Sequence, residues 1–386
     1  MFLNKIKYSQ YDSDIREWKL NGFGLKKINL IVGKNSAGKS KSLSIINGLS
    51  IILGENSKLP FLIGNYEVEF ITPLQNHINY KLVYDKGFVV QESLNIGDVN
   101  YISRDADGEG MILSSSGNYN EFKVPENELI STRRDEKQYP YLTDLYDWAR
   151  MVRIFHFGSD SMTLFGARDK TKKVDTEYNL KVTANIVDTF NRGVKIHGED
   201  FKKLIIADFN SIGYQISDID LGGLTTVLLQ VVDNPNVEII GLKVKESDLE
   251  CWTEQTDMSN GMYRALSLII QFNYYEFESI SGCVLIDDIG EGLDFERSVK
   301  LIKLLINKVE SGKNDIQLIM STNDRFVMNN VDLKYWQIIN RSGPSVNYYN
   351  EENSKKIFEQ FKYSGLSKFD FFATDFFKTG FDSEEE

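Results

Sequence analysis

An α/β fold is predicted for this chain by three patterns in its sequence. The short apolar run Lys27 to Val32 ends in a glycine-rich turn and passes into Ser40 to Leu53, whose apolar residues recur on one helical face. From Tyr66 onward, apolar and polar residues alternate as in an antiparallel meander. Helical spacing returns between Asn179 and Gly213, and a strand pattern follows at Val237 to Val244. The chain therefore combines strands and helices in two lobes.

Composition places the chain among ordinary globular proteins. Hydrophobic residues make up 41% of its 386 residues and charged residues 26%, which is typical of a folded, enzyme-sized chain. The formal net charge is -12, which argues against a uniformly basic face that binds nucleic acid, so any contact with nucleic acid is expected to be local. The densest basic run has two readings, a contact with nucleic-acid phosphate or a solvated loop, and consists of Arg168, Lys170, Lys172 and Lys173.

The expected location is a reducing cytoplasm. Cys251 and Cys283 lie far apart and lack the spacing of metal ligands, so neither a disulfide framework nor a zinc site is supported. The most apolar early stretch, Leu43 to Leu53, is interrupted by polar residues and is too short to cross a bilayer. We therefore expect no membrane segment and no membrane partner.

A phosphate-binding loop stands between the first apolar run and the helix that follows it. Its residues match the P-loop pattern in full, in the strand-to-helix context that this motif requires. The glycines let backbone NH groups converge on phosphate oxygens, the lysine reaches the β and γ phosphates, and the last hydroxyl ligates Mg²⁺. The pattern predicts a P-loop NTPase that binds ATP and Mg²⁺. The loop consists of Gly33, Lys34, Asn35, Ser36, Ala37, Gly38, Lys39 and Ser40.

A pair of carboxylates follows a buried strand pattern further along the chain. The run Cys283 to Ile286 is apolar and leads directly into Asp287 and Asp288. In phosphoryl transfer the first acid of such a pair holds Mg²⁺ and the second positions the attacking water. Acid pairs are also common at solvated strand ends, but the P-loop upstream favours the catalytic interpretation.

A third segment links the loop and the carboxylates to one family. Met258 to Met262 precede a helical pattern, so Ser259 can cap that helix and direct its hydroxyl and NH groups at an anion. The segment lies a few helical turns before the strand that ends at Asp287, and Gly292 to Asp294 follow that strand. In this order the segments resemble the signature motif, metal-binding strand and D-loop of the soluble ABC ATPases of the SMC, RecF and OLD-like group.

The resemblance implies an ABC ATPase head in which two subunits enclose two ATP molecules. Residues 1–366 would form one head, with the meander in lobe I at about 1–160 and a helical lobe that carries the signature and the carboxylate strand at about 161–366. An aromatic and then acidic tail would occupy 367–386. By family position, Asp287 would hold the metal, Asp288 would hold the water, Ser259 and Gly261 would meet the γ phosphate of the other subunit, and Asp294 would cross the dimer axis.

Two positions depart from the family pattern. Asp288 replaces the usual glutamate and is one methylene shorter, so slow turnover is expected. After the run Leu318 to Thr322 the family usually has a histidine, whereas this chain has Asn323. An asparagine can donate to a γ phosphate but cannot take up a proton near neutral pH. The position is therefore expected to bind phosphate rather than to move a proton.

Three assignments stay open from the sequence. Gln138 and the segment His156 to Ser159 are both candidates for the Q-loop. Tyr11 or Trp18 could stack on adenine, although aromatic residues before a first strand are more often part of a core. The phenylalanine-rich segment from Ser367 is either a packed final helix or a docking site for a partner, and the acidic residues after it are expected to be solvated.

The favoured function is that of an ATP-controlled switch. We expect a homodimer or a higher homo-oligomer that couples its ATP state to a separate effector such as a nuclease or toxin, as stand-alone ATPases of prokaryotic anti-phage systems do. A RecF-like or SMC-like ATPase of DNA repair, or a clamp ATPase, is the alternative. A transporter nucleotide-binding subunit is less favoured, because a long meander and a helical lobe separate the P-loop from the signature.

Overall fold

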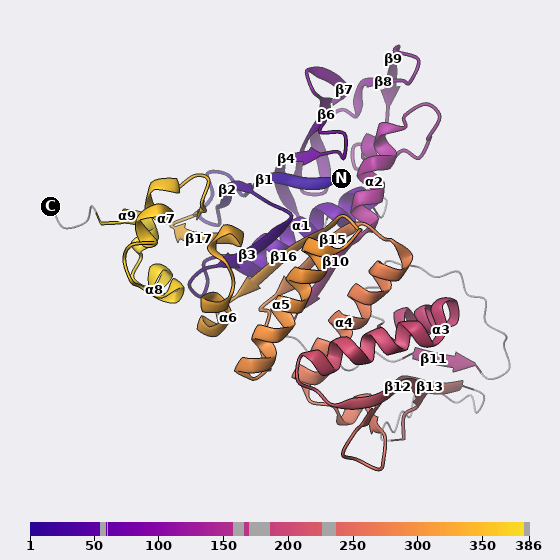
Figure 1. The fold of residues 1–386 in the computed structure, drawn as a ribbon. Coiled ribbons are helices and arrows are strands. Elements are labelled where there is room, and N and C mark those ends of the chain that lie inside the picture. The colour runs from indigo at the N-terminus through magenta and orange to yellow at the C-terminus, as the bar shows by residue number, and fades with distance from the viewer. Residues whose placement is uncertain (55–58, 60, 157–165, 170–185, 226–236, 382–386) are drawn as a thin grey trace. The chain divides into compact units, whose positions relative to one another are not determined.

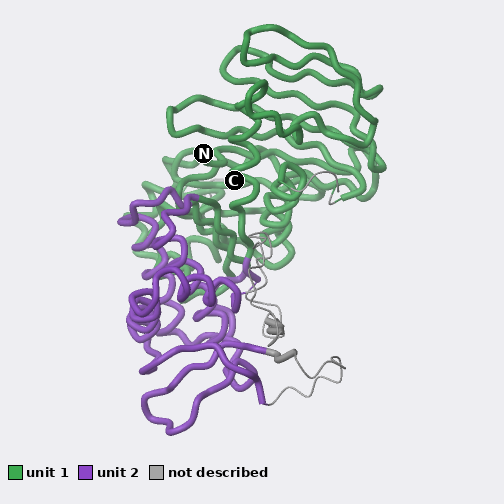
Figure 2. Tube along the Cα trace, turned by 90° about the vertical axis from the view of Figure 1, so that its right-hand side faces the viewer, with its two compact units in different colours: residues 1–154, 282–287, 317–386 green, residues 155–281, 288–316 purple. Residues whose placement is uncertain are grey.

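The computed structural model describes residues 1–54, 59, 61–156, 166–169, 186–225 and 237–381 (Figure 1). The chain divides into two compact units, coloured separately in Figure 2. Unit 1 contains Met1–Ile154, Gly282–Asp287 and Gln317–Glu386, and unit 2 contains Phe155–Ser281 and Asp288–Ile316. The division differs from the expected boundary near residue 160, because the strands that end at Asp287 and Thr322 return to the sheet of unit 1.

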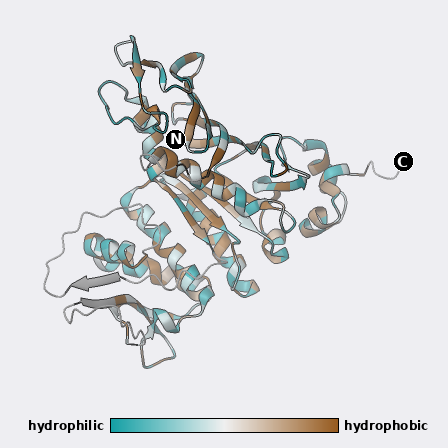
Figure 3. Ribbon diagram, turned by 180° about the vertical axis from the view of Figure 1, so that it is seen from behind, coloured by the Kyte–Doolittle hydropathy of each residue, from teal (hydrophilic) through white to brown (hydrophobic). Residues whose placement is uncertain are grey.

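The centre of unit 1 is a buried group of strands within a 14-stranded sheet. β3 (Ile28–Val32) lies between β16 (Ile316–Thr322) and β17 (Trp336–Ser342) and runs parallel to both. Every residue of β3 and β16 is buried, as expected for parallel strands covered on both faces. Hydrophobic strands of this kind are brown in Figure 3. β15 (Gly282–Asp287) and then β10 (Val152–His156) follow β16 in the order of the sheet.

The other end of the sheet is an antiparallel meander, which confirms the interpretation of the alternating residues. β4 and β5 pair along their whole length, from Ile63 opposite Asp85 to Ile71 opposite His77. Alternate residues of both strands are buried, so one face of the meander packs into the core. Beyond β17 the strands are, in spatial order, β18 (Ser345–Tyr349), β2 (Trp18–Gly24), β1 (Phe2–Gln10), β4 (Ile63–Ile71), β5 (His77–Asp85), β6 (Phe88–Ile96), β7 (Val99–Arg104), β8 (Glu109–Leu113) and β9 (Tyr119–Lys123).

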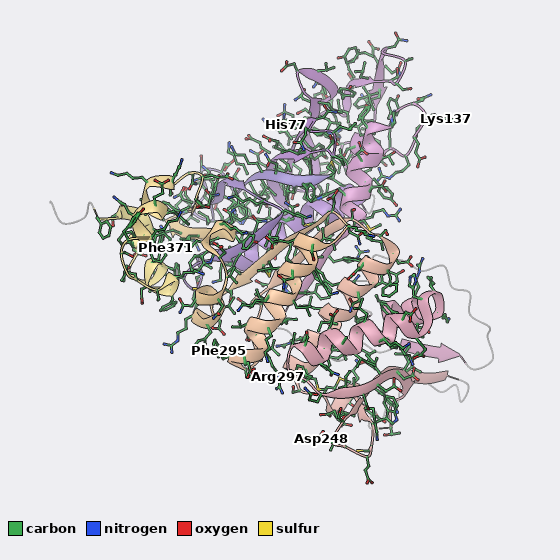
Figure 4. The ribbon with its side chains drawn as sticks, viewed as in Figure 1. His77, Lys137, Asp248, Phe295, Arg297 and Phe371 are labelled. Atoms are coloured by element: carbon green, nitrogen blue, oxygen red, sulfur yellow. The ribbon has the colours of Figure 1, made fainter. Side chains whose placement is uncertain are left out.

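The helices of unit 1 include α1, which follows β3, and three short helices near the end of the chain. The first helix begins at Lys39, so the last two residues of the loop 33–40 already belong to it. Phe371, which Figure 4 labels, Phe372 and Phe377 are buried, whereas Phe381 is exposed. Part of the phenylalanine-rich segment therefore packs within the chain, in two short helices rather than one. The helices are α1 (Lys39–Gly54), α2 (Tyr141–Arg150), α6 (Arg325–Asn330), α7 (Lys355–Phe361), α8 (Lys368–Ala373) and α9 (Phe376–Thr379), with 3-10 turns at Ile130–Thr132 and Leu333–Tyr335.

Unit 2 combines helices with a second sheet, whereas the resemblance implied a helical lobe. α3 (Ile186–Ser211) packs along α4 (Asn260–Glu278) and bends at Gly198, where φ is 61°. The strand predicted from Val237 is confirmed as β13. The remaining elements are β11 (Gly166–Asp169), β12 (Ile216–Gly223), β13 (Val237–Glu246), β14 (Thr253–Glu254), α5 (Phe295–Ser311) and a 3-10 turn at Gln255–Asp257. Within the described ranges, no helix combines the length and hydropathy that a membrane span requires.

Candidate functional site

The glycine-rich loop follows β3 at the carboxyl edge of the parallel strands. Its backbone makes a tight turn, in which φ is 63° at Ser36 and 106° at Gly38. Gly33 lies so close to Ile339 that a Cβ at this position would be 2.9 Å from the carbonyl oxygen of Ile339. A turn of this kind directs successive backbone NH groups toward one point, which is the geometry that binds phosphate. Ligands of α/β sheets bind at this edge of the strands.

Lys39 and Ser40 begin α1 and place their side chains beside the loop. Lys39 is only 5% exposed, and its Nζ donates to the carbonyl oxygen of Gly33 at 2.9 Å and to that of Lys34 at 3.4 Å. The loop carbonyls therefore hold the ammonium group at the inner side of the turn. A helix N-terminus with an adjacent cation is a binding site for anions, and for phosphate in particular.

Asp287 ends β15 and reaches the start of α1. The Oγ of Ser40 donates to Oδ1 of Asp287 at 3.1 Å, although the two residues are 247 positions apart. Asp287 is 8% exposed. A hydroxyl oxygen and a carboxylate oxygen are the hard donors that Mg²⁺ prefers, and Mg²⁺ sites in nucleotide-binding proteins use one or two such groups together with substrate phosphates. The pair therefore fits a magnesium ion that accompanies a nucleotide.

Asn323 follows β16 at the same edge of the sheet. Thr322 pairs with Val32 in the parallel ladder, so Asn323 and Gly33 are the next residues in register. Asn323 is exposed, and the residue after it, Asp324, caps α6 by accepting from the NH of Phe326 at 2.6 Å. This position suits an amide that contacts a bound phosphate, and the contact itself stays a prediction.

Asp288 adopts a backbone conformation that most residues avoid. Its φ is 53°, in the left-handed region, where asparagine and aspartate are several-fold enriched among non-glycine residues. Strain of this kind costs on the order of 1 to 3 kcal/mol and clusters at active sites and ligand clamps. The left-handed backbone therefore gives a physical reason for an aspartate at this position in place of the longer glutamate.

The segment expected to be the signature begins α4 in unit 2. Ser259 is the N-cap, because its Oγ accepts from the NH of Met262 at 3.2 Å, and the predicted cap is confirmed. Gly261 lies against the chain after β15, where a Cβ would be 2.2 Å from the carbonyl oxygen of Gly292. Gly292 itself has a φ of 80°. The predicted signature and the predicted D-loop are therefore in contact within unit 2.

Asp294, the last residue of that loop, caps the following helix. Its Oδ1 accepts from the NH of Arg297 at 2.9 Å, and its Oδ2 lies 3.1 Å from the guanidinium group of the same arginine. Arg297 in turn stacks on Tyr214, with 4.2 Å between its guanidinium carbon and the ring centroid. Figure 4 labels Arg297 and Phe295 at the start of α5. Asp294 thus contacts its own subunit here, and its role across a dimer axis stays a proposal.

Replacing Gly261 with alanine is expected to destabilise the protein. Gly261 is the second residue of α4, and within helices alanine is normally more favourable than glycine, by about 1 kcal/mol in a helix interior. Here the added methyl group would meet a backbone oxygen, and such overpacking costs about 1 to 3 kcal/mol. Thermal unfolding should therefore show a lower midpoint for Gly261→Ala than for Asn260→Ala at the exposed neighbouring position. A midpoint that rises instead would show that Gly261 does not pack on the D-loop as described.

The aromatic candidates for adenine stacking have other contacts. Trp18 is buried, and its ring atom Cζ2 lies 3.2 Å from the position of a Cβ on Gly38, so Trp18 supports the loop from within the core. Tyr11 is partly exposed and stacks with Arg16, whose guanidinium carbon is 4.2 Å from the ring centroid. The burial of Trp18 favours its interpretation as a core residue. For Tyr11, adenine stacking and a structural role both stay open.

The candidates for the Q-loop occupy different places. Gln138 is exposed in the loop before α2, where its NH donates to Asp135 at 3.0 Å. β10, the neighbour of the Asp287 strand in the sheet, ends at His156. Residues 157–159 lie outside the described residues, as do residues 170–173 of the basic run and the acidic residues 382–386. The Q-loop therefore stays unassigned.

Two contacts at the site were not predicted from the sequence. The Oγ of Ser321, in β16, donates to Oδ1 of Asp287 at 2.6 Å. The exposed Lys34 of the loop pairs with Asp375 before α9, with 3.1 Å between Nζ and the carboxylate. Lys34 and Lys378 lower the pKa of Asp375, although partial burial opposes them. A hydroxyl residue near the end of a mostly apolar strand was the available signal for Ser321, whereas no local pattern indicates Asp375.

Comparison with known proteins shows the fold. No family model matches the chain, and no curated protein matches it in sequence. The head of an SMC protein bound to the C-winged helix domain of ScpA aligns with 92% of this chain and 100% of its own, with a TM-score of 0.50 and 14% identity. The SMC head domain from Thermotoga maritima aligns with 91% and 99%, with a TM-score of 0.45 and 15% identity. The expected fold class is thus confirmed at the level of an SMC-head-like α/β fold.

Proposed function

We propose that this chain binds ATP with Mg²⁺ at the loop 33–40 and hydrolyses it slowly within a head-to-head dimer. One observation carries the proposal: Asp287, from a distant part of the sequence, lies within hydrogen-bond distance of Ser40 at the N-terminus of the loop helix. The loop alone fits many anions, but a loop joined to an acidic strand end fits a nucleotide together with its metal. The SMC-head-like fold agrees with this function.

The residues then have distinct tasks. Mg²⁺ neutralises charge on the phosphate oxygens, and Ser40 and Asp287 are the groups of this chain that would hold it. Lys39 supplies a positive charge that the loop carbonyls already orient. Asp288 would accept a hydrogen bond from the attacking water, and Asn323 would donate its amide to the γ phosphate. The short side chain of Asp288 and the absence of an imidazole at position 323 suit slow turnover.

The second half of the proposed active site comes from another subunit. Ser259 and Gly261 belong to unit 2 and the loop 33–40 belongs to unit 1. In the family that the sequence resembles, the signature of one head faces the γ phosphate held by the other. The N-terminus of α4, with Ser259 as its cap, presents backbone NH groups that can bind such a phosphate. We therefore place one P-loop and one partner signature in each site.

Mixing two inactive variants tests the shared site. Lys39→Ala should bind nucleotide poorly, and Ser259→Arg should bind it without hydrolysis, because a bulky cation would block the start of α4. In a stoichiometric mixture half of the random dimers are mixed and hold one intact site each, so about a quarter of parental phosphate release should return. The matched control pairs Ser259→Arg with a chain that carries both substitutions and cannot complete a site. Equal rates in the two mixtures would refute sharing.

The cellular role that we propose is a switch that acts on a separate effector in anti-phage defence, with DNA repair or clamp function as the alternative. The support is the resemblance in sequence and a site suited to holding ATP longer than a motor would. Purification of the chain with the products of its neighbouring genes tests the role. A nuclease or toxin that co-elutes only with ATP present agrees with the proposal, and a replication or repair protein favours the alternative.

A further inference from the structure

One buried hydroxyl near the proposed metal site has no role in the function as described so far. Ser321 lies in β16, where all seven residues are buried, and it is itself 0% exposed. It pairs with Ile31 of the central strand β3, so its backbone is fixed in the parallel ladder. A hydroxyl in such surroundings costs free energy unless it makes a hydrogen bond. Its hydroxyl donates a hydrogen bond to Asp287.

Ser321 donates to the same carboxylate oxygen of Asp287 that accepts a hydrogen bond from Ser40 at the start of α1. Ser321 donates to Oδ1 of Asp287 at 2.6 Å, and Ser40 donates to the same Oδ1 at 3.1 Å. The two hydroxyls come from different elements, β16 and α1. An O–H donor to an ionised carboxylate makes a short bond that is about twice as strong as a neutral one. The carboxylate is therefore oriented by a rigid strand as well as by the helix.

We propose that Ser321 is a positioning residue for the metal-binding carboxylate: it holds Asp287 in the orientation in which its side chain meets Ser40. The inference rests on the proposed function, since it assigns Ser321 a task at the same magnesium site. Groups that hydrogen-bond to a metal ligand reduce the entropy lost when the metal binds, and their removal typically lowers metal affinity by about 10- to 100-fold. Ser321 does not touch the nucleotide in this assignment.

The experiment measures the Mg²⁺ requirement of nucleotide binding, without turnover. A fluorescent ATP analogue is held at fixed concentration while Mg²⁺ is titrated against the full-length parent, Ser321→Ala, Ser321→Thr and Ser50→Ala. Ser50 is a matched buried serine, whose hydroxyl bonds to Asn47 within α1. Ser321→Ala should raise the Mg²⁺ concentration at half-saturation about 10-fold. Ser321→Thr, which keeps the hydroxyl, and Ser50→Ala should both stay near the parent.

The outcomes separate this inference from the function on which it rests. If nucleotide binding to the parent needs Mg²⁺ and Ser321→Ala reaches half-saturation at the same Mg²⁺ concentration, Ser321 does not position Asp287. If the only effect of Ser321→Ala is a lower unfolding midpoint, Ser321 has a packing role. If Ser321→Thr raises the Mg²⁺ concentration at half-saturation as far as Ser321→Ala does, the hydroxyl does not cause the effect and the inference is overturned. If the parent itself shows no Mg²⁺-dependent binding, the proposed function fails. Should Ser321→Ala not fold, the comparison of Ser321→Thr with Ser321→Cys, which lacks the hydroxyl, decides.

Discussion

Asp288→Asn is expected to slow ATP hydrolysis on the order of 100-fold or more while leaving nucleotide bound, because a water that is not held in line loses most of its reactivity. Asparagine keeps the size of the side chain and tolerates the left-handed backbone at this position, where φ is 53°. The variant should therefore fold like the parent and accumulate as an ATP-loaded dimer. Steady-state phosphate release at saturating ATP, with light scattering for the mass, measures both effects.

Asp288→Glu is the control for the length of the side chain. Glutamate restores the missing methylene, so turnover should equal or exceed that of the parent if the short side chain limits the rate. The left-handed backbone should at the same time lower its unfolding midpoint, since glutamate is less common than aspartate in that region. If Asp288→Asn hydrolyses ATP as fast as the parent, Asp288 does not position the water and the mechanism is wrong.

The local parts of the site could be predicted from the sequence. The strand before the loop, the helix after it, the acidic end of β15 and the cap of α4 each depend on a few neighbouring residues with a clear period or motif. Their bounds differ from the predicted ones by about a residue, as at α1, which begins at Lys39 and ends at Gly54. Such segments are recognisable because a strand end, a glycine-rich turn or a helix cap restricts the types and the order of a few neighbouring residues.

The long-range parts could not be predicted in the same way. The order β15, β16, β3 in the sheet brings together strands that are far apart in the chain, and only this order makes Ser321 a neighbour of Asp287. The pair Lys34 and Asp375 spans 341 positions and depends on how the last helices pack. The sheet in unit 2 was not predicted, because β12 carries Asp218, Asp220 and two glycines, which are rare in strands.

The central claim is that the loop 33–40 binds the phosphates of ATP. Isothermal titration calorimetry of the protein with ATP in the presence of Mg²⁺ tests it. Lys39→Ala removes a buried ammonium group that the loop orients at 2.9 Å from Gly33. A hydrogen bond to a charged group is worth about 1.5 to 3 kcal/mol, so each bond lost should weaken binding about 10- to 100-fold. The control is Lys26→Ala. Lys26 precedes the other end of β3, and its Nζ donates to the backbone carbonyl oxygen of Lys334 and forms an ion pair with Glu352. We predict saturable binding by the parent and by Lys26→Ala, and a large loss for Lys39→Ala. Equal affinity of Lys39→Ala and the parent would contradict the assignment of the loop.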